Sequence, residues 1–449
     1  MNLENIKHIH FVGIGGIGMS GIAEILADRG IRVSGCDLKR SAAGDLLVAR
    51  GVPVLAGHDP AHLEGVDLVV VTAAVKGHNA EIDAARDRGI PVMKRKEMLG
   101  AIVKAGRGIG VSGTHGKTTT SAMVATVLAE AGLDPTVIVG GMLRNLGTNA
   151  RSGSGEFVVV EADEYDRTFH ALEPEIAVVT NIEADHLDYY GSFEAIEEAF
   201  RAFVSRVRGV VIGCVDEAPV ARLLDGCPPR LRAVRYGLSE AADIRAINVT
   251  FHDRGSAFEV PGLGFFKLFV PGEHNVLNAL AAIAVARELG IDTSVTAAGL
   301  AKFLGVDRRF QILGDYAGAI VVDDYAHHPT EIRATLDAAR RGYPGRRLVA
   351  LFQPHLYSRT VDFAREFGES LRVADVAIVS PIYAARERAV EGISARIIAD
   401  AVSGVEFLDR SHVEIINELR RRLQPNDIFV AMGAGDVHEI AEALVRGAA

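Results

Sequence analysis

The sequence predicts an α/β protein of three domains, each built on a mainly parallel sheet. Glycine-rich turns lie between an apolar strand and a helix at residues 13–18 and again at 113–116. Strand–helix units repeat through residues 312–449. The length of 449 residues agrees, because roughly 150 residues make one domain. We expect domains at residues 1–106, 107–311 and 312–449.

Composition and charge exclude several classes of protein. Hydrophobic residues make up 49% and charged residues 24%, which is typical of a folded globular chain. A net charge of −10 argues against a nucleic-acid partner. Neither a signal peptide nor an apolar run of about 18 residues is apparent. Cys36, Cys214 and Cys227 are far apart, which predicts buried, unreactive thiols with no disulfide or metal spacing, as in the reducing cytoplasm.

The first glycine-rich turn predicts a diphosphate site. Gly13, Gly15 and Gly18 follow a strand and match G-x-G-x-x-G, and a second strand ends at Asp37, nineteen residues after Gly18. This spacing is typical of dinucleotide sites. However, a backbone that approaches closely at a helix N-terminus suits any diphosphate, and the acidic residue suits any ribose or polar ring. NAD and a nucleotide-sugar therefore both remain open.

The second turn predicts a phosphate loop. Residues 109–111 form a strand, Gly113 and Gly116 follow, and an amphipathic helix is expected from Lys117 toward Gly132. We expect the backbone N–H groups of Gly113 to Lys117 to converge on an anion, with Lys117 beside the β- and γ-phosphates and Thr118 directed at Mg²⁺. Val111 stands where the general P-loop pattern has glycine, so a turn that caps an ordinary helix is the alternative.

Two further strands end in carboxylates. Residues 157–161 end at Glu161, and residues 176–180 lead to Asp185 and His186. At the carboxyl ends of parallel strands these groups are expected to face the γ-phosphate and to bind Mg²⁺. A solvated acidic loop is the alternative.

The end of the second domain changes in character. Residues 244–270 alternate with period two, which predicts an inserted antiparallel meander. A long helix then carries Asn275 and Asn278, whose spacing allows both to face one ligand, although a helix cap plus a core amide is the alternative. Arg308 and Arg309 lie near the next boundary, and paired arginines are typical both of phosphate sites and of ordinary surfaces.

The third domain has polar loops after two of its strands. The strands at 319–323 and 347–352 are followed by loops that carry His327, His355 and Arg359. Such loops lie where open α/β sheets bind ligands. Each histidine alone is more often structural, but together the three side chains are suited to hold a carboxylate and steer an amine.

Eight motifs resemble those of the Mur ligase family, and more narrowly of its alanine-adding branch, over essentially the whole length. They are HFVGIGGIGMSGIAEIL, SGTHGKTTT, VEADEYD, TNIEADHLDYY, PGEHNVLNA, GVDRRFQ, DDYAHHPTEI and FQPHLYSRT. The resemblance implies an N-terminal Rossmann-like domain, a central P-loop ATPase domain with a parallel sheet plus a small antiparallel sheet, and a C-terminal Rossmann-like domain.

The resemblance also implies a reaction. ATP and Mg²⁺ would drive the ligation of L-alanine to UDP-N-acetylmuramate through an acyl phosphate. The enzyme would act in the cytoplasm in peptidoglycan synthesis, and so in cell wall biogenesis, cell shape, cell division and the cell cycle. It would be a monomer or homodimer with no nucleic-acid or membrane partner.

Site residues follow by motif position. The resemblance implies UDP-sugar contacts from Gly15, Gly16, Ile17, Gly18, Asp37, Thr72 and Arg95. It implies ATP contacts from Gly113, Thr114, His115, Gly116, Lys117, Thr118, Thr119, Asn275, Asn278 and Arg309. It implies Mg²⁺ ligands Thr118, Glu161 and His186, and catalytic roles for Lys117, Glu161, His186, His327, His355 and Arg359. Arg359 would pair with the carboxylate of L-alanine, and His355 is a candidate base.

Two departures and three rival functions remain. The chain has no lysine between Lys117 and Lys267, so the carbamylated lysine of other Mur ligases is absent from its usual stretch, in agreement with the alanine-adding branch. Leu356 stands where some members have arginine. The rivals are a ligase that recycles a tripeptide onto the same nucleotide, an NAD-dependent oxidoreductase, and a non-catalytic nucleotide sensor.

Overall fold

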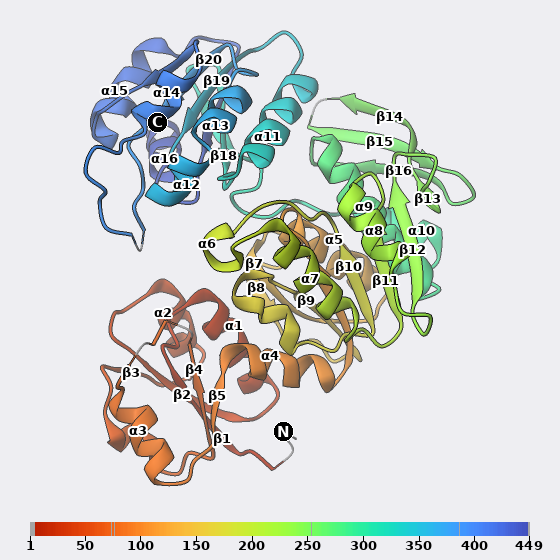
Figure 1. Cartoon of the computed structure of the whole chain (residues 1–449), viewed down its shortest axis with the longest axis vertical. Coiled ribbons are helices and arrows are strands. Elements are labelled where there is room, and N and C mark those ends of the chain that lie inside the picture. The colour runs from red at the N-terminus through yellow and green to blue at the C-terminus, as the bar shows by residue number, and fades with distance from the viewer. Residues whose placement is uncertain (1–4, 73, 76, 253, 386, 448–449) are drawn as a thin grey trace. The chain divides into compact units, whose positions relative to one another are not determined.

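The computed structural model describes residues 5–72, 74–75, 77–252, 254–385 and 387–447 (Figure 1). The chain divides into two compact units. The first contains Met1–Ala246, Pro261–Leu263 and Leu277–Leu300, and the second contains Ile247–Val260, Gly264–Val276 and Ala301–Ala449. The three domain boundaries given above stay predictions.

The first unit begins with a five-stranded parallel sheet. Its strands, in spatial order, are β3 (Val54–Ala56), β2 (Arg32–Asp37), β1 (His8–Val12), β4 (Leu68–Val71) and β5 (Val92–Lys94). The connections contain α1 (Ile17–Asp28), α2 (Ala42–Ala49), η1 (Pro60–Leu63), α3 (Ala80–Asp87) and α4 (Arg95–Lys104). Since side chains alternate along a strand, Ile9 and Phe11 of β1 pack on one face, whereas Val12 packs with Ile82 of α3 on the other.

An eight-stranded sheet forms the rest of the first unit. Its order is β13 (Ile244–Arg245), β12 (Arg232–Gly237), β11 (Val210–Cys214), β10 (Ile176–Val179), β6 (Arg107–Ser112), β9 (Phe157–Glu161), β7 (Thr136–Leu143) and β8 (Thr148–Arg151). Only the β7–β8 pair is antiparallel among these described strands. The associated helices are α5 (Lys117–Glu130), η2 (Tyr165–Ala171), α6 (Leu187–Tyr190), α7 (Phe193–Val204), α8 (Ala218–Asp225), α9 (Glu273–Glu288) and α10 (Thr293–Ala301). Because β9, β6 and β10 are neighbours, their carboxyl ends lie side by side.

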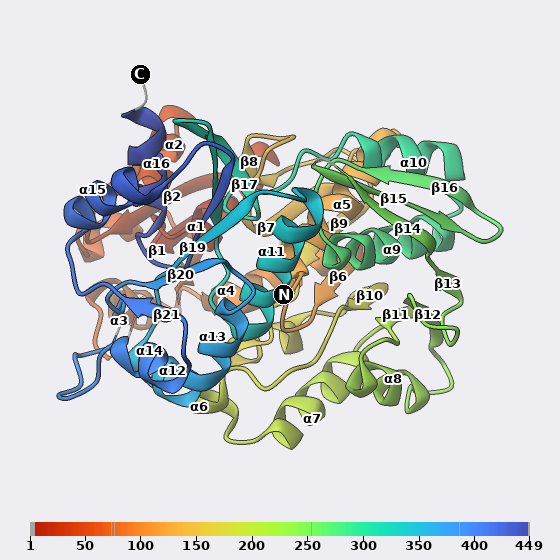
Figure 2. The same cartoon turned by 90° about the horizontal axis from the view of Figure 1, so that it is seen from above.

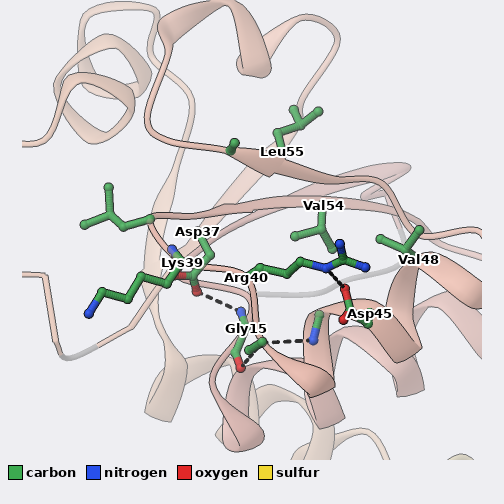
Figure 3. Close-up of a pocket in the computed structure, with 12 residues that line it drawn as sticks. Gly15, Asp37, Lys39, Arg40, Asp45, Val48, Val54 and Leu55 are labelled. Carbon is green, nitrogen blue, oxygen red and sulfur yellow. Dashed lines mark hydrogen bonds and ion pairs between the residues drawn. The ribbon is translucent and has the colours of Figure 1, made fainter.

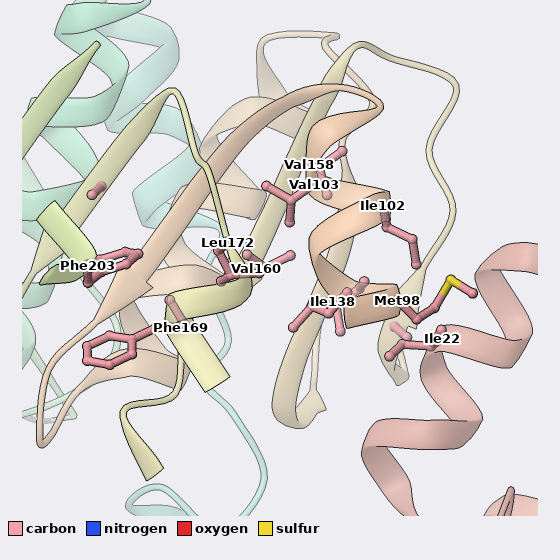
Figure 4. Close-up of a cluster of buried hydrophobic side chains, with 14 of the residues drawn as sticks. Ile22, Met98, Ile102, Val103, Ile138, Val158, Val160, Phe169, Leu172 and Phe203 are labelled. Carbon is pink, nitrogen blue, oxygen red and sulfur yellow. The ribbon is translucent and has the colours of Figure 1, made fainter. Parts of the chain in front are cut away.

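A continuous apolar core joins the two sheets of this unit. Figure 4 shows Ile22 of α1 and Met98 and Ile102 of α4 packing toward Ile138 of β7. All four belong to one cluster of buried side chains. Burial of apolar area on this scale is the main stabilising contribution to the unit.

The second unit contains a small antiparallel sheet and a larger mixed one. The first consists of β14 (Ile247–His252), β15 (Gly255–Val260) and β16 (Gly264–Leu268). The second has the order β17 (Gln311–Tyr316), β18 (Ala319–Asp324), β22 (Asp427–Met432), β19 (Arg347–Phe352), β20 (Val376–Val379) and β21 (Val405–Phe407), and β17 is its antiparallel edge.

Helices cover both faces of this six-stranded sheet (Figure 2). The core on one face includes α11 (Pro329–Gly342), α13 (Ala364–Leu371) and α14 (Arg396–Ala401), and the core on the other includes α15 (His412–Arg422) and α16 (His438–Arg446). A short helix, α12 (Tyr357–Asp362), follows β19. The predicted α/β class with parallel sheets and a small antiparallel sheet is confirmed. No helix among the described residues is long and apolar enough to cross a membrane.

Three local expectations were wrong. Ile244 and Arg245 do not belong to the antiparallel meander, because they form β13 and pair in parallel with β12. Helix α5 is not amphipathic, since Thr120, Ser121 and Val124 are all buried around it. A helix that lies between a sheet and other elements has no solvent-facing stripe to mark it. Cys36 and Cys214 are buried as expected, but Cys227 is only partly so.

Candidate active site

The first glycine-rich turn lies against three of the side chains predicted to bind substrate. A Cβ atom added to Gly13 would lie 2.5 Å from Thr72 Cγ2, one on Gly15 would lie 2.9 Å from Asp37 Oδ2, and one on Gly18 would lie 2.7 Å from Arg95 Nη1. Real Cβ atoms essentially never approach so closely, so glycine is what lets these groups reach the turn. Gly16 and Ile17 complete the turn at the start of α1.

A pocket of about 320 Å³ opens beside Gly15 (Figure 3). The N–H of Gly15 donates to Asp37 Oδ2 at 2.9 Å, and Ser41 Oγ donates to the Gly15 carbonyl at 2.9 Å. Lys39 and Arg40 add positive charge to the lining. The remaining lining residues are Leu38, Gly44, Asp45, Val48, Val54, Leu55 and Ala56. Arg40 pairs with Asp45 at 2.7 Å, and Asp37 adds a second carboxylate, so the lining carries charges of both signs. Such a polar edge beside an apolar wall suits a polar ligand that also carries a ring.

The phosphate loop joins β6 to α5 and is held by the end of β10. Gly116 is the helix cap and has φ +80°, a conformation that favours glycine. The N–H groups of Thr114 and His115 donate to the backbone oxygen and Oδ1 of Asn181, at 3.2 and 2.7 Å. The N–H groups that have no intrahelical partner at the start of α5, including those of Lys117 and Thr118, are therefore the ones placed to meet an anion.

Lys117 links this loop to a carboxylate that sequence analysis did not single out. Its Nζ donates to Gly113 O at 2.6 Å and to Glu164 Oε2 at 2.7 Å, and the Glu164 side chain is only 4% exposed. Burial works to lower the pKa of Lys117, but Glu164, Asp163 and Glu161 outweigh it and raise that pKa above its usual value. Burial raises the pKa of Glu164 to about 7 although Lys117 opposes the shift. The signal for Glu164 was its place in VEADEYD, directly after β9.

Thr118 and Glu161, two of the residues expected to bind Mg²⁺, are in direct contact. Thr118 Oγ1 donates to Glu161 Oε2 at 2.9 Å, and the N–H of Gly140 donates to the same oxygen at 2.7 Å. His186, at the start of α6, lies 3.7 Å from both Glu164 Oε1 and Asp185 Oδ2. A hydroxyl and a carboxylate oxygen are ligands that Mg²⁺ prefers, so these residues fit the ion.

Helix α9 carries the two predicted asparagines, which have different partners. Asn278 is buried, and Thr120 Oγ1 of α5 donates to its Oδ1 at 2.9 Å. A Cβ on Gly116 would lie 2.7 Å from the same oxygen, so Asn278 supports the phosphate loop. Asn275 donates from Nδ2 to Pro271 O at 2.6 Å, at the start of its own helix. Thr119 is partly exposed on the first turn of α5.

The second unit brings the predicted histidines together. The rings of His327 and His355 are 6.1 Å apart and nearly perpendicular, and His355 stacks on Tyr383 at 6.0 Å. Arg359 is buried on α12, one turn after His355. Leu356, which directly follows His355, has φ +71° and is also buried. This is a strained conformation of the kind that clusters at functional sites.

The two arginines near β17 have different environments. Arg309 Nη1 lies 3.5 Å from Glu331 Oε1, and its guanidinium stacks over Tyr325 at 5.4 Å. Arg308 donates to Gly433 O at 2.7 Å, and its Nε lies 3.5 Å from Asp323 Oδ2. Burial raises the pKa of Asp323 to about 7, although Arg308 opposes the shift. Sequence analysis had no signal for the contact of Arg308 with Gly433, which is distant along the chain.

Comparison with known proteins assigns family models along most of the chain. The model "Mur ligase family, catalytic domain" matches residues 8–107, the "Mur ligase middle domain" matches 111–286, and the "Mur ligase, glutamate ligase domain" matches 308–435.

Individual relatives are similar over almost the full length. A UDP-N-acetylmuramate–L-alanine ligase from Geobacter sulfurreducens is 46% identical, with 98% of this chain and 97% of that protein covered. The crystal structure of a UDP-N-acetylmuramate-alanine ligase from Thermotoga maritima has a TM-score of 0.82 at 30% identity and covers 98% of both chains. A murein peptide ligase from Psychrobacter arcticus has a TM-score of 0.69 at 26% identity, again over 98% of both.

Proposed function

The chain belongs to the Mur ligase family, and we propose that it joins L-alanine to the lactyl carboxylate of UDP-N-acetylmuramate in peptidoglycan synthesis. It is a ligase that forms an amide bond at the expense of ATP. The observation that carries the proposal is the contact of Thr118 with Glu161, because it places a hydroxyl and a carboxylate at the mouth of a phosphate loop whose lysine is already buried beside them. An oxidoreductase has no need of this pair, and a non-catalytic nucleotide sensor has no need of His327, His355 and Arg359.

The first site would bind the UDP-sugar. The diphosphate would lie over Gly15, Gly16, Ile17 and Gly18 at the start of α1, where backbone N–H groups and the helix dipole favour an anion. Arg95 lies against this turn and would pair with the diphosphate, and Thr72 and Asp37 would contact the sugar and nucleotide. The pocket beside Gly15, with Lys39 and Arg40, would accommodate part of the nucleotide.

The second site would bind ATP. The phosphate loop (residues 113–119) would hold the β- and γ-phosphates, and Lys117 would exchange its contacts with Gly113 and Glu164 for phosphate oxygens. Asn275, Asn278 and Arg309 would lie in the adenosine and phosphate region. Mg²⁺, held by Thr118, Glu161 and His186, would neutralise charge on the transferred phosphoryl group. Phosphorylation of the lactyl carboxylate would release ADP and give an acyl phosphate.

The third site would bind the amino acid. Arg359 would pair with the carboxylate of L-alanine, and His327 and His355 would orient the amine toward the acyl phosphate. Attack of the amine nitrogen on the acyl carbon would form the amide bond, release phosphate and leave one proton, for which His355 is the candidate base. Orientation of this kind is the main contribution that a protein makes to transfer reactions.

Two rivals are less well supported. The tripeptide-recycling ligase shares the first two sites, but the alanine ligase from T. maritima has the higher TM-score, 0.82 against 0.69 for the murein peptide ligase from P. arcticus, and the alanine ligase from G. sulfurreducens is 46% identical over 98% of this chain. An oxidoreductase would leave Glu161, Glu164 and Lys117 without a role. We further propose a cytoplasmic enzyme, a monomer or homodimer, whose product serves cell wall synthesis and cell division.

A competition experiment tests the substrate assignment. The chain is incubated with UDP-N-acetylmuramate, ATP and Mg²⁺ in the presence of equal amounts of L-alanine and the tripeptide, and the nucleotide product is identified by mass spectrometry. We expect the L-alanine adduct to predominate. The tripeptide adduct as the main product would move the chain to the recycling branch.

A further inference from the structure

A buried polar cluster lies on the α3 face of the five-stranded sheet, and none of its side chains is among the groups assigned above. It consists of His10 of β1, Cys36 of β2, His62 of η1 and Glu81 of α3. One ligand-type atom from each side chain lies within 4.8 Å of the others. His10, Cys36 and Glu81 are fully buried, and the His62 side chain is 16% exposed. Four elements of the fold thus converge on one point.

The contacts inside the cluster centre on Glu81. Cys36 Sγ donates to Glu81 Oε2 at 2.8 Å, and His62 Nδ1 lies 2.5 Å from Oε1. His10 Nε2 lies 3.4 Å from Oε1 and makes no hydrogen bond to any residue that the structure describes. This long contact to a carboxylate oxygen is thus the one polar contact that the described residues offer the buried nitrogen. A buried polar atom that lacks a hydrogen bond costs free energy, which points to a ligand.

A chain of hydrogen bonds fixes the orientation of the His10 ring. His10 Nδ1 lies 2.9 Å from Ser34 Oγ, and the same oxygen lies 2.8 Å from His8 Nε2. His8 Nδ1 in turn lies 3.1 Å from Gly65 O. Metal-binding histidines almost always have their second nitrogen held in this way, which sets the tautomer and directs the other nitrogen at the ion.

We propose that His10, Cys36, His62 and Glu81 bind one zinc-type divalent cation. Two imidazole nitrogens, a thiolate and a carboxylate match the ligands and the coordination number of structural Zn²⁺ sites. Tetrahedral bonds of 2.0–2.3 Å require ligand atoms roughly 3.3–3.8 Å apart, so the short contacts to Glu81 would open slightly. Binding replaces the Cys36 S–H donor by a thiolate and releases that proton to solvent. All four positions are filled by protein, so the ion would be structural and would fix the end of β2 next to Asp37.

This site differs chemically from the magnesium site at the phosphate loop. Mg²⁺ prefers oxygen ligands, whereas a thiolate and imidazoles select zinc-like ions. The proposal therefore does not depend on the proposed ligase reaction, and it is tested in the presence of excess Mg²⁺. The alternative is a hydrogen-bonded network without an ion.

Cobalt uptake by the full chain tests the proposal. The chain is treated with chelator, returned to metal-free buffer that contains Mg²⁺, and titrated with Co²⁺. We expect uptake of one equivalent, with the d–d absorption of four-coordinate Co²⁺, a thiolate-to-cobalt charge-transfer band, and loss of both when Zn²⁺ is added. Cys36→Ser is expected to lose the charge-transfer band, and Cys227→Ser, the matched control, to retain it.

A second variant keeps the proposal testable if Cys36→Ser does not fold. His62 is partly exposed, so His62→Ala is expected to keep the fold, as measured by circular dichroism, and to weaken Co²⁺ binding at least roughly tenfold. His78→Ala is the control, because His78 is an exposed histidine just before α3, the helix that carries Glu81. This variant is expected to bind Co²⁺ as the wild type does. No uptake by the wild type, uptake without a charge-transfer band, or equal binding by folded His62→Ala would each overturn the proposal.

Discussion

At the scale of single residues, Lys117 is the group on which the ATP assignment depends most. Its Nζ already contacts the loop carbonyl of Gly113 and the carboxylate of Glu164. We expect Lys117→Ala to abolish ATP turnover while leaving UDP-N-acetylmuramate binding largely intact, because the glycine turn after β1 is built from a different sheet. Calorimetry with each ligand measures this. Lys104→Ala, at an exposed lysine, is the control, and loss of both ligands in a folded Lys117→Ala would contradict the assignment.

Substitution of Arg359 tests the amino-acid site separately from the ATP site. It is buried on α12 one turn from His355, and the proposed function assigns it to the carboxylate of L-alanine. We expect Arg359→Ala to raise KM for L-alanine roughly tenfold or more, since a charge-assisted hydrogen bond contributes about 1.5–3 kcal/mol, and to change KM for ATP little. Steady-state kinetics with each substrate varied in turn measures the difference. Arg365→Ala, at an exposed position on α13, is expected to leave both KM values unchanged. Equal effects of Arg359→Ala on KM for both substrates would contradict the assignment of Arg359 to the amino-acid site.

The buried carboxyl of Asp323 is expected to make the free energy of unfolding depend on pH. Burial raises its pKa from 3.8 to about 7, despite Arg308. Between these values the folded chain keeps a proton that the unfolded chain has lost, so this group makes stability fall as pH rises through that window. We expect Asp323→Asn to flatten the decline between about pH 4 and 7, measured as the melting temperature of the full chain across this pH range. An unchanged slope would mean that Asp323 is ionised throughout.

At the scale of elements, the end of β10 supports the phosphate loop. Asn181 accepts from His115 N through its side chain and from Thr114 N through its backbone. Asn181 Nδ2 also donates to His115 O at 3.3 Å. We expect Asn181→Ala to remove both side-chain bonds to His115 but to keep the backbone bond, and, since each bond contributes about 0.5–1.5 kcal/mol, to raise KM for ATP roughly fivefold or more. KM for UDP-N-acetylmuramate, measured in the same preparation, is the internal control. A rise in that constant instead would show that the loop does not depend on Asn181.

The elements that carry motifs were predictable, because glycine turns and strand-end carboxylates are local patterns. Strands β6, β9 and β10 were identified from short apolar runs, and their adjacency brings Lys117, Glu161 and His186 to one edge. The antiparallel edge strand β17 and the two-residue β13 gave no such pattern. Helix α5 was misread because burial on all sides removes the periodicity on which an amphipathic assignment depends.

Long-range contacts limited what the sequence could reveal about the sites. Glu164 stood in a quoted motif, but only the fold shows that it pairs with Lys117. Cys36 was expected to be inert because no metal spacing surrounds it in the sequence. The fold instead brings His10, His62 and Glu81 to it from three other elements.

At the scale of the whole molecule, the family assignment rests on similarity over 98% of the chain. Three family models follow one another along the chain, whereas its contacts divide it into two compact units. The family assignment confirms the resemblance found in the motifs. The roles of individual site residues and the domain boundaries stay predictions that the variants above address.

The most direct test of the central claim is phosphate release from ATP by the full chain. The assay contains UDP-N-acetylmuramate and Mg²⁺ and compares L-alanine, the tripeptide and no acceptor. We expect release that depends strictly on L-alanine, because the acyl phosphate needs an amine to proceed to the amide. Release only with the tripeptide would contradict the assignment to the alanine-adding branch, and no release with either would contradict the catalytic role of the phosphate loop.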